Sequence, residues 1–294
     1  GENSEEILIE ESSRNPKIRY PIKLTGLEIY SPNAILVSLD NGQILMDKKS
    51  GERIYPASLT KIMTAIVAIE QLSNLNQTIT ISEKMFDYLY VQEASVAGFL
   101  PNETARAIDL LYGIILPSGA DASIALAEYI AGSEEKFVDL MNEKAAKLNM
   151  NDTHFVNVTG LHDPNHYSTV KDIALLLQYA LSNPTFFEIF TSAYHTTMPT
   201  DMHPEGLTFY STMFSKMGNP HLEHGKILGG KTGYTGEAGL CLASLALIDS
   251  KLFILVTAGA DGNQPEPLHI LDAFHIYSEL QNHLGMNHFF QMAS

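Results

Sequence analysis

A serine and a lysine stand three positions apart in the stretch PASLTKIMTAIVAIEQL, at Ser58 and Lys61. From residue 62 to 69 the sequence is apolar on nearly every helical face, which predicts a helix buried on all sides. At this spacing the two side chains share one face of the helix. Burial and the positive end of the helix macrodipole both lower the pKa of a lysine from its usual value of about 10.4. The pair therefore predicts a serine nucleophile beside a lysine that can act as a base.

A structural interpretation of Ser58 is also open, because a serine hydroxyl at the start of a helix commonly accepts a hydrogen bond from a first-turn N–H. Two further elements argue for chemistry. Ser118 lies in PSGAD, in a break between helical stretches, and Lys231-Thr232-Gly233 lies in a strand-like run after two glycines. Each alone has an ordinary explanation, a turn for PSG and a surface strand for the lysine. The three elements in this order are far more specific.

This order of motifs resembles the serine penicillin-recognising enzymes, and among them the low-molecular-mass D-alanyl-D-alanine carboxypeptidases of the peptidase S11 type. The stretches PASLTKIMTA, LLYGIILPSGADAS, FVNVTGLHDPNHYST and GGKTGYTGEAG carry the resemblance, which covers about residues 30–280. It implies a serine D,D-carboxypeptidase that removes the terminal D-alanine from peptidoglycan stem peptides through an acyl-enzyme. It also implies covalent inhibition by β-lactam antibiotics, and neither a cofactor nor a metal.

The resemblance assigns a role to each residue that matches a motif. Ser58 would attack the carbonyl of the substrate, and neutral Lys61 would accept its proton. Ser118 would relay a proton to the departing D-alanine. Lys231 would add positive charge to the site, and Thr232 would hydrogen-bond the free carboxylate of the substrate.

The resemblance also assigns backbone roles, and it exposes one departure. Gly233 would let its strand approach the substrate closely, and the N–H groups of Ser58 and Tyr234 would form the oxyanion hole. The family usually has Asn two positions after the second-motif serine, where this chain has Ala120. Loss of that amide would cost about 1–2 kcal/mol, roughly tenfold in rate. Asp121 is expected to point elsewhere within its local turn.

Two neighbouring functions remain open at this point. A β-lactamase of this fold would need an E-x-x-x-N element between the second and third motifs, and none occurs there. Glu70 and Asn74 have the spacing but follow the nucleophile on its own helix. A non-catalytic penicillin-binding sensor would share acylation of Ser58 and lack turnover, and Ala120 is compatible with that interpretation.

Eleven histidines and one cysteine raise the question of other chemistry. His162 and His166 have a proline between them, which spoils a helical ligand pair, and His221 and His224 flank Leu-Glu rather than forming HExxH. Cys241 lies in an apolar run and is predicted to be a core residue. The sequence therefore predicts no metal site and no internal disulfide.

Composition bounds the partners and the location. The chain has 294 residues and a formal net charge of -16, so nucleic acid and anionic membrane surfaces are not expected partners. No apolar stretch of about 18 residues could span a membrane, and GENSEEILIEESS lacks the features of a signal peptide. By resemblance the protein works outside the cytoplasmic membrane, in the bacterial cell envelope. A signal peptide and any membrane anchor would be segments absent from this chain.

The elements that must position these residues can be predicted from the pattern. AILVSLDNGQILMDKK predicts a β-hairpin with its turn at residues 40–42. Residues 78–132 have a mostly helical pattern, and EEKFVDLMNEKAAKLNM and VKDIALLLQYAL predict two further helices. Residues 185–225 show no clear period. ILGGKTGYT, GLCLASLALID and KLFILVTAGAD predict three strands, and PLHILDAFHIYSELQNHL predicts a closing helix.

The predicted fold is mixed α+β, of the β-lactamase/transpeptidase-like type. About five strands from both ends of the chain would form one antiparallel sheet with helices on its faces. After a loose lead-in over residues 1–20, residues 21–294 would form a single catalytic domain. A helical subdomain at about residues 75–165 would carry Ser118, and Ser58 would lie in the cleft between this subdomain and the sheet-bearing part.

Overall fold

The structure is a computed structural model that describes residues 23–293, with only the backbone described for residues 286–293. The lead-in predicted over residues 1–20 lies outside the described residues. The described part contains the sheet, the helices and every candidate site residue named above.

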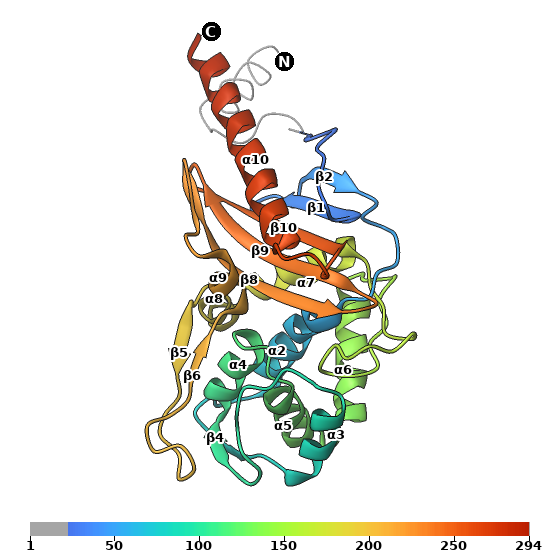
Figure 1. The fold of residues 1–294 in the computed structure, drawn as a ribbon, viewed down its shortest axis with the longest axis vertical. Coiled ribbons are helices and arrows are strands. Elements are labelled where there is room, and N and C mark those ends of the chain that lie inside the picture. The colour runs from blue at the N-terminus through green and yellow to red at the C-terminus, as the bar shows by residue number, and fades with distance from the viewer. Residues whose placement is uncertain (1–22, 294) are drawn as a thin grey trace, which may run out of the picture.

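A six-stranded antiparallel sheet in the order β2-β1-β10-β9-β8-β7 forms the scaffold (Figure 1). Its strands are β1 (Asn33–Ser38), β2 (Ile44–Lys48), β7 (His221–Leu222), β8 (Gly225–Thr235), β9 (Gly239–Ile248) and β10 (Lys251–Ala260). β1 pairs with β10, from Asn33 opposite Ala258 to Ser38 opposite Phe253, so the two ends of the chain share one sheet. This confirms the predicted architecture of five long strands, which the two-residue strand β7 extends at one edge.

Helices cover both faces of the sheet, with α7 packed on β1 and β10 and α10 packed on β9 and β10 (Figure 1). The helices are α2 (Thr60–Gln71), α3 (Phe86–Val91), α4 (Ala107–Ile115), α5 (Ala120–Ala131), α6 (Glu134–Lys147), α7 (Val170–Leu181), α8 (Pro184–Phe190), α9 (Thr212–Met217) and α10 (Leu268–Ala293), with short 3-10 turns η1 (Ala57–Leu59) and η2 (Glu83–Met85). Successive side chains of β1 enter opposite core layers, Ile35 on the α2 and α7 side and Leu36 on the α10 side. Both faces are buried, so the four central residues of β1, 34–37, are all apolar.

Two of the predicted helices, α6 and α7, begin directly after a residue whose side chain caps the helix. The Ser133 hydroxyl accepts the N–H of Lys136 at the start of α6. The Thr169 hydroxyl accepts the N–H of Asp172 at the start of α7. Each cap satisfies one first-turn donor that would otherwise lack an intrahelical partner. Among the described helices, none is long and apolar enough to cross a membrane.

Two pairs of short strands depart from the sequence-based expectation. Within the stretch predicted to be mostly helical, β3 (Thr78–Thr80) pairs antiparallel with β4 (Thr104–Arg106). The helical prediction was wrong for these residues because a three-residue strand depends on a distant partner, which local periodicity does not reveal. In the region without a clear period, β5 (Tyr194–Thr196) pairs with β6 (Thr208–Tyr210).

A buried carboxylate joins the β5–β6 hairpin to α4. Asp109 is 1% exposed, and its oxygens lie 2.7 Å from Nε2 of His195, 3.0 Å from Nε of Arg106 and 3.1 Å from the N–H of Met198. Burial raises the pKa of Asp109, but the hydrogen bonds from His195, Arg106 and Met198 outweigh it, so the pKa is lowered overall. The Tyr112 ring stacks on the imidazole of His195 at 3.7 Å. These contacts fix the hairpin that leads directly into α9, beside the candidate site.

Replacing Asp109 with alanine is expected to lower the free energy of unfolding by about 3 kcal/mol, because Arg106, His195 and the Met198 N–H lose their shared buried partner. Urea titration at neutral pH measures the change. Asp139→Ala, on the exposed face of α6, is the matched control and should change the value by less than about 0.5 kcal/mol. Equal stabilities of the two variants would contradict this account of the hairpin.

Candidate active site

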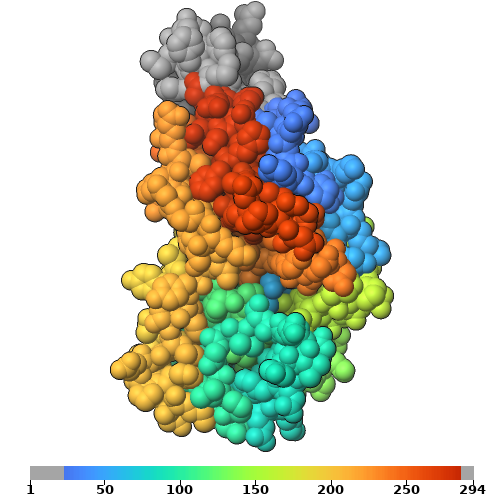
Figure 2. All heavy atoms as spheres, in the orientation of Figure 1, coloured from blue at the N-terminus to red at the C-terminus, as the bar shows by residue number. Residues whose placement is uncertain are grey.

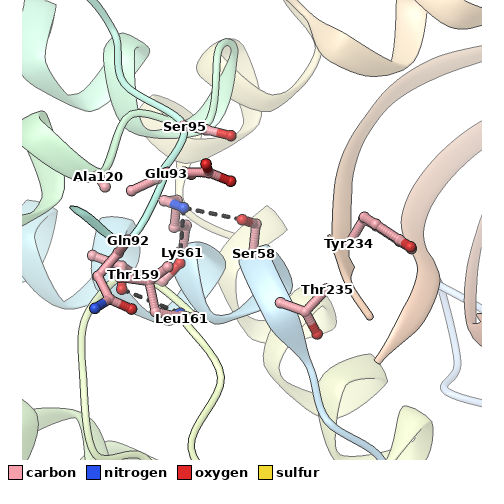
Figure 3. Close-up of a pocket in the computed structure, with 12 residues that line it drawn as sticks. Ser58, Lys61, Gln92, Glu93, Ser95, Ala120, Thr159, Leu161, Tyr234 and Thr235 are labelled. Carbon is pink, nitrogen blue, oxygen red and sulfur yellow. Dashed lines mark hydrogen bonds between the residues drawn. The ribbon is translucent and has the colours of Figure 1, made fainter. Parts of the chain in front are cut away.

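The structure brings Ser58 and Lys61 together at the start of α2. Ser58 lies in η1, and Nζ of Lys61 donates to its hydroxyl at 3.0 Å and to the carbonyl oxygen of Thr159 at 2.8 Å (Figure 3). Neither η1 nor α2 has a side-chain cap. The capping interpretation of Ser58 is therefore excluded, and its hydroxyl is instead the partner of a lysine.

The environment of Lys61 lowers the cost of losing its proton. Ten of the twelve residues of α2 are buried, and Lys61 is 2% exposed. Burial lowers its pKa to about 7, while the charge of Asp121 acts in the opposite direction. A pKa this far below that of an exposed lysine makes the neutral side chain accessible near neutral pH, which suits a general base.

A second serine–lysine pair lies beside the first. Lys231, on β8, is fully buried, and its Nζ donates to the hydroxyl of Ser118 at 3.0 Å and to the carbonyl of Thr232 at 2.6 Å. Burial, together with the charges of Lys61 and Lys216, lowers the pKa of Lys231 well below its usual value. Because Lys231 is the donor, the single hydroxyl proton of Ser118 can be given to another acceptor.

The backbone is strained at both serine elements. Ala57, immediately before Ser58, has a φ of +48°, and Ser118 has a φ of +64°. Residues other than glycine adopt this region rarely and at a cost of about 1–3 kcal/mol, and they persist there only where the surroundings enforce it. Of the eight non-glycine residues with positive φ in the described part of the chain, two therefore belong to the serine elements.

Two glycines clamp the turn that carries Ser58. A Cβ at Gly233 of β8 would lie 2.8 Å from the backbone nitrogen of Ser58 and 3.3 Å from Cβ of Ala57. A Cβ at Gly160 would lie 1.9 Å from the carbonyl oxygen of Ala57. The close approach of this strand to the substrate, which the resemblance assigns to Gly233, stays a prediction. In the structure, the space that a side chain at Gly233 would occupy is filled by the backbone of Ser58 and by Cβ of Ala57.

Thr232 connects the site to the β5–β6 hairpin. Its hydroxyl oxygen lies 2.6 Å from that of Thr212, the first residue of α9. The N–H of Thr212 donates to the carbonyl of Leu116, two residues before Ser118. The hairpin and the loop before α5 are therefore joined at the point where the second and third motifs meet.

A hollow of about 160 Å³ opens in front of Ser58, between the sheet and the helices below it (Figure 2). Its lining includes three predicted residues, Ser58, Lys61 and Tyr234, while Ser118 and Lys231 lie beside it. Ala120, the departure noted in the second motif, also lines the hollow. The lining residues that the sequence analysis did not identify are Gln92, Glu93, Ala94, Ser95, Thr159, Gly160, Leu161 and Thr235 (Figure 3). The stretch FVNVTGLHD could have indicated those at 159–161, because it is among the family-like segments. Nothing in the local pattern singles out residues 92–95.

Asp121 explains how residues 92–95 reach the hollow. Its carboxylate accepts the N–H groups of Ala97 at 2.7 Å and of Gly98 and Phe99 at 3.1 Å. The N–H of Ala120 donates to the carbonyl of Ser95 at 2.8 Å. Asp121 thus points into this loop, as expected, and its side chain does not take the place of the amide that Ala120 lacks.

The other candidate residues have structural roles. Nδ1 of His166 accepts the N–H of Val156 and Nε2 lies 2.7 Å from the Thr60 hydroxyl, and burial lowers the His166 pKa to about 4. Cys241 is buried, and burial raises its thiol pKa to about 12, which confirms it as a core residue. Glu70 bonds Lys144 and Tyr179 and does not line the hollow. Over the described residues, no three His, Cys, Asp or Glu side chains gather into a metal cluster.

A serine hydroxyl bonded to a buried lysine, beside a buried serine–lysine pair that bridges a loop and a strand, is the arrangement expected of a serine acyl-transfer site of the penicillin-recognising class. Comparison with known proteins agrees. The model of the peptidase S11 family, D-alanyl-D-alanine carboxypeptidase, matches residues 21–262. The chain belongs to this family.

Individual relatives give the same result. D-alanyl-D-alanine carboxypeptidase DacF of Bacillus subtilis is 36% identical over 234 residues, 78% of this chain and 57% of that protein. DacD of Escherichia coli is 31% identical over 80% of this chain and 59% of its own length. The crystal structure of the Streptomyces K15 DD-transpeptidase superimposes with a TM-score of 0.74 at 26% identity, covering 92% of this chain and all of that one. The chain spans a little over half the length of the two curated relatives.

Substituting Gly233 by alanine is expected to slow acylation of Ser58 by a labelled penicillin about 100-fold, because the new Cβ would displace the backbone of the nucleophile. Gly236→Ala is the matched control on the same chain segment, since a Cβ there meets nothing within 4 Å. Stopped-flow or gel-based labelling measures both rates. A Gly233→Ala rate equal to that of Gly236→Ala would show that the close approach of β8 is not needed.

Proposed function

We propose that this protein is a serine D,D-carboxypeptidase that removes the terminal D-alanine from peptidoglycan stem peptides through an acyl-enzyme on Ser58. The observation that carries the proposal is the 3.0 Å contact between the Ser58 hydroxyl and Lys61 Nζ, with burial holding the Lys61 pKa at about 7. Membership of the family supports the substrate class.

Acylation begins with the neutral form of Lys61. Its Nζ takes the proton of Ser58 while Oγ attacks the carbonyl carbon of the D-Ala-D-Ala bond. The negative charge that develops on the carbonyl oxygen is stabilised by the N–H groups of Ser58 and Tyr234. These two backbone segments can lie close together because Gly233 has no side chain to separate them. The carbonyl of Thr159 accepts from Lys61, so the ammonium that forms keeps a fixed partner.

Departure of D-alanine requires a proton on its nitrogen. Ser118 relays this proton, since its hydroxyl accepts from Lys231 and keeps its own proton to give. The hydroxyl passes that proton to the leaving nitrogen and takes up the one that Lys61 accepted from Ser58, so Lys61 is neutral again. Thr232 bonds the free carboxylate of the substrate, and Lys231 adds positive potential when protonated. Water then hydrolyses the acyl-enzyme, with Lys61 again as the base.

The same attack on a β-lactam carbonyl opens the ring and leaves a stable acyl-enzyme, so penicillins act as covalent inhibitors. Because its substrate is peptidoglycan, the protein acts outside the cytoplasmic membrane, in the cell envelope. The helices between about residues 75 and 165 serve as the subdomain that presents Ser118 to the sheet-bearing part of a single catalytic domain spanning residues 21–294.

The two alternative functions differ in what happens after acylation. A β-lactamase needs a carboxylate that activates the deacylating water, and Glu70, the residue with the matching spacing, is engaged by Lys144 and Tyr179. A sensor would stop at the acyl-enzyme, and Ala120 is the feature that favours it. The intact contacts of Ser118 and Lys231 favour turnover.

Release of free D-alanine from a peptide ending in D-Ala-D-Ala tests the proposal directly. Wild type should release it, Ser58→Ala should lose release by at least about 10³-fold, and EDTA should have no effect. Release that survives in Ser58→Ala would overturn the Ser58–Lys61 mechanism. Stoichiometric labelling by penicillin without any release of D-alanine would assign the protein to the sensor class.

Restoring the amide is expected to increase turnover. Ala120 is 1% exposed and lines the hollow with Lys61, so an asparagine there can bond the lysine and the substrate carbonyl. Ala120→Asn should raise the rate of D-alanine release about tenfold. Ala120→Ser, which adds a polar group too short to make both bonds, is the control. A rate for Ala120→Asn at or below that of wild type would show that the missing amide does not limit catalysis.

A further inference from the structure

A second hollow, of about 350 Å³, lies behind the third motif. It is formed where the end of α9, the start of β9 and the start of α10 meet. Its lining consists of Lys216, Leu240, Gly262, Gln264, Pro265, Glu266, Pro267 and His269. This volume is at the lower end of the range for small-molecule sites.

The second hollow shares a wall with the catalytic hollow. Tyr234 lines the catalytic side, and its ring packs so closely on Gly262 that a Cβ there would lie 2.3 Å from Cε2. Gly262 lines the second hollow. One aromatic ring therefore stands between the two.

His269 is the buried polar group of this second hollow. The residue is 1% exposed, and neither ring nitrogen has a hydrogen-bond partner among the described residues. Leaving such groups unsatisfied costs about 1–3 kcal/mol each, and unsatisfied groups in a native fold commonly mark a ligand or water position. Burial and the charge of Lys216 lower the His269 pKa to about 4. The neutral ring therefore offers one donor and one acceptor to an occupant.

Two side chains of opposite charge also line this hollow. Lys216 lies in the last turn of α9 and Glu266 just before α10. Among the described residues neither forms an ion pair. α10 begins at Leu268, so the positive end of its macrodipole is also at the hollow. Leu240, Pro265 and Pro267 supply apolar surface.

We propose that this second hollow binds a free α-amino acid of the size of D-alanine, with its carboxylate on Lys216 and the donor nitrogen of His269, and its ammonium on Glu266 and the acceptor nitrogen. The apolar residues face the small side chain. A zwitterion can pair with Lys216 and Glu266 at once, whereas a ligand with a single charge can pair with only one of them.

The identity of the amino acid rests on the proposed function, because D-alanine is the product released on the other side of Tyr234. A site there would hold the leaving amino acid close to the acyl-enzyme and slow its escape. High D-alanine would then reduce net turnover.

Titration of D-alanine into ¹⁵N-labelled protein, followed by chemical-shift changes, measures the binding. The expected dissociation constant is on the order of 1 mM, given the few atoms of the ligand. Propionate, which lacks the ammonium, and ethylamine, which lacks the carboxylate, are expected to bind at least about tenfold more weakly.

Three variants locate the site. Lys216→Ala should weaken D-alanine binding about tenfold or more, whereas Lys226→Ala, an exposed lysine at the far end of β8, should leave it unchanged. Glu266→Gln should weaken D-alanine binding without affecting propionate. His269→Leu should abolish binding of both, and circular dichroism establishes that it folds.

No saturable binding of D-alanine, or binding equally strong in Lys216→Ala and Lys226→Ala, would overturn the proposal. Glu266→Gln weakening propionate as much as D-alanine would also overturn the two-charge recognition. The assay needs no turnover, so it separates the two proposals. Lys216-dependent binding of D-alanine in a protein that releases none from the peptide would support the second site and refute the carboxypeptidase proposal. Release of D-alanine without such binding would support the carboxypeptidase and refute the second site.

Discussion

The burial of Lys61 against Ser58 is the constraint on which the rest of the structure depends. A lysine in the first turn of a helix buried on nearly all sides cannot hold its proton as firmly as one in water. Among the residues that the structure describes, Asp121 is the carboxylate whose charge opposes this effect, and three loop N–H groups already occupy that carboxylate. The charge of Lys61 in turn helps to lower the pKa of the second buried lysine, Lys231. Burial alone therefore brings the pKa of Lys61 close to neutral pH.

Much of the remaining scaffold keeps this arrangement aligned. Gly233 and Gly160 allow β8 and the 159–161 loop to close on the strained turn around Ala57. The sheet brings β8 to this place by pairing strands from both ends of the chain, with α2 packed beneath it. Positive φ at Ser118 and the Thr212–Thr232 contact fix the other side of the site. The strained backbone at these positions lowers the stability of the fold, as is common at functional sites.

The sequence indicated a large part of this account, for identifiable reasons. Helices and strands with long runs of periodic apolar residues, such as α7 and β10, were predictable because period and burial agree. The Ser58–Lys61 pair stood out because a lysine conflicts with an apolar helix. Three-residue strands such as β3 and β4 were not predictable, since their partners lie far along the chain. Glu93 and Ser95 were missed because a buried carboxylate on another element, Asp121, holds their loop at the site. The packing of Gly233 against the backbone of Ser58 was not predicted, because that contact joins segments far apart in the chain.

The protonation state of Lys61 in the resting protein tests the central claim most directly. Proteins carrying ¹³C at lysine Cε, with Lys61 assigned by comparison with Lys61→Arg, can be titrated by NMR between pH 5 and 11. The account predicts a midpoint near 7 for Lys61, far below the value of about 10.4 for an exposed lysine. A midpoint near 10 would mean that Lys61 is a cation at neutral pH, and the assignment of Lys61 as the base that activates Ser58 would have to be abandoned.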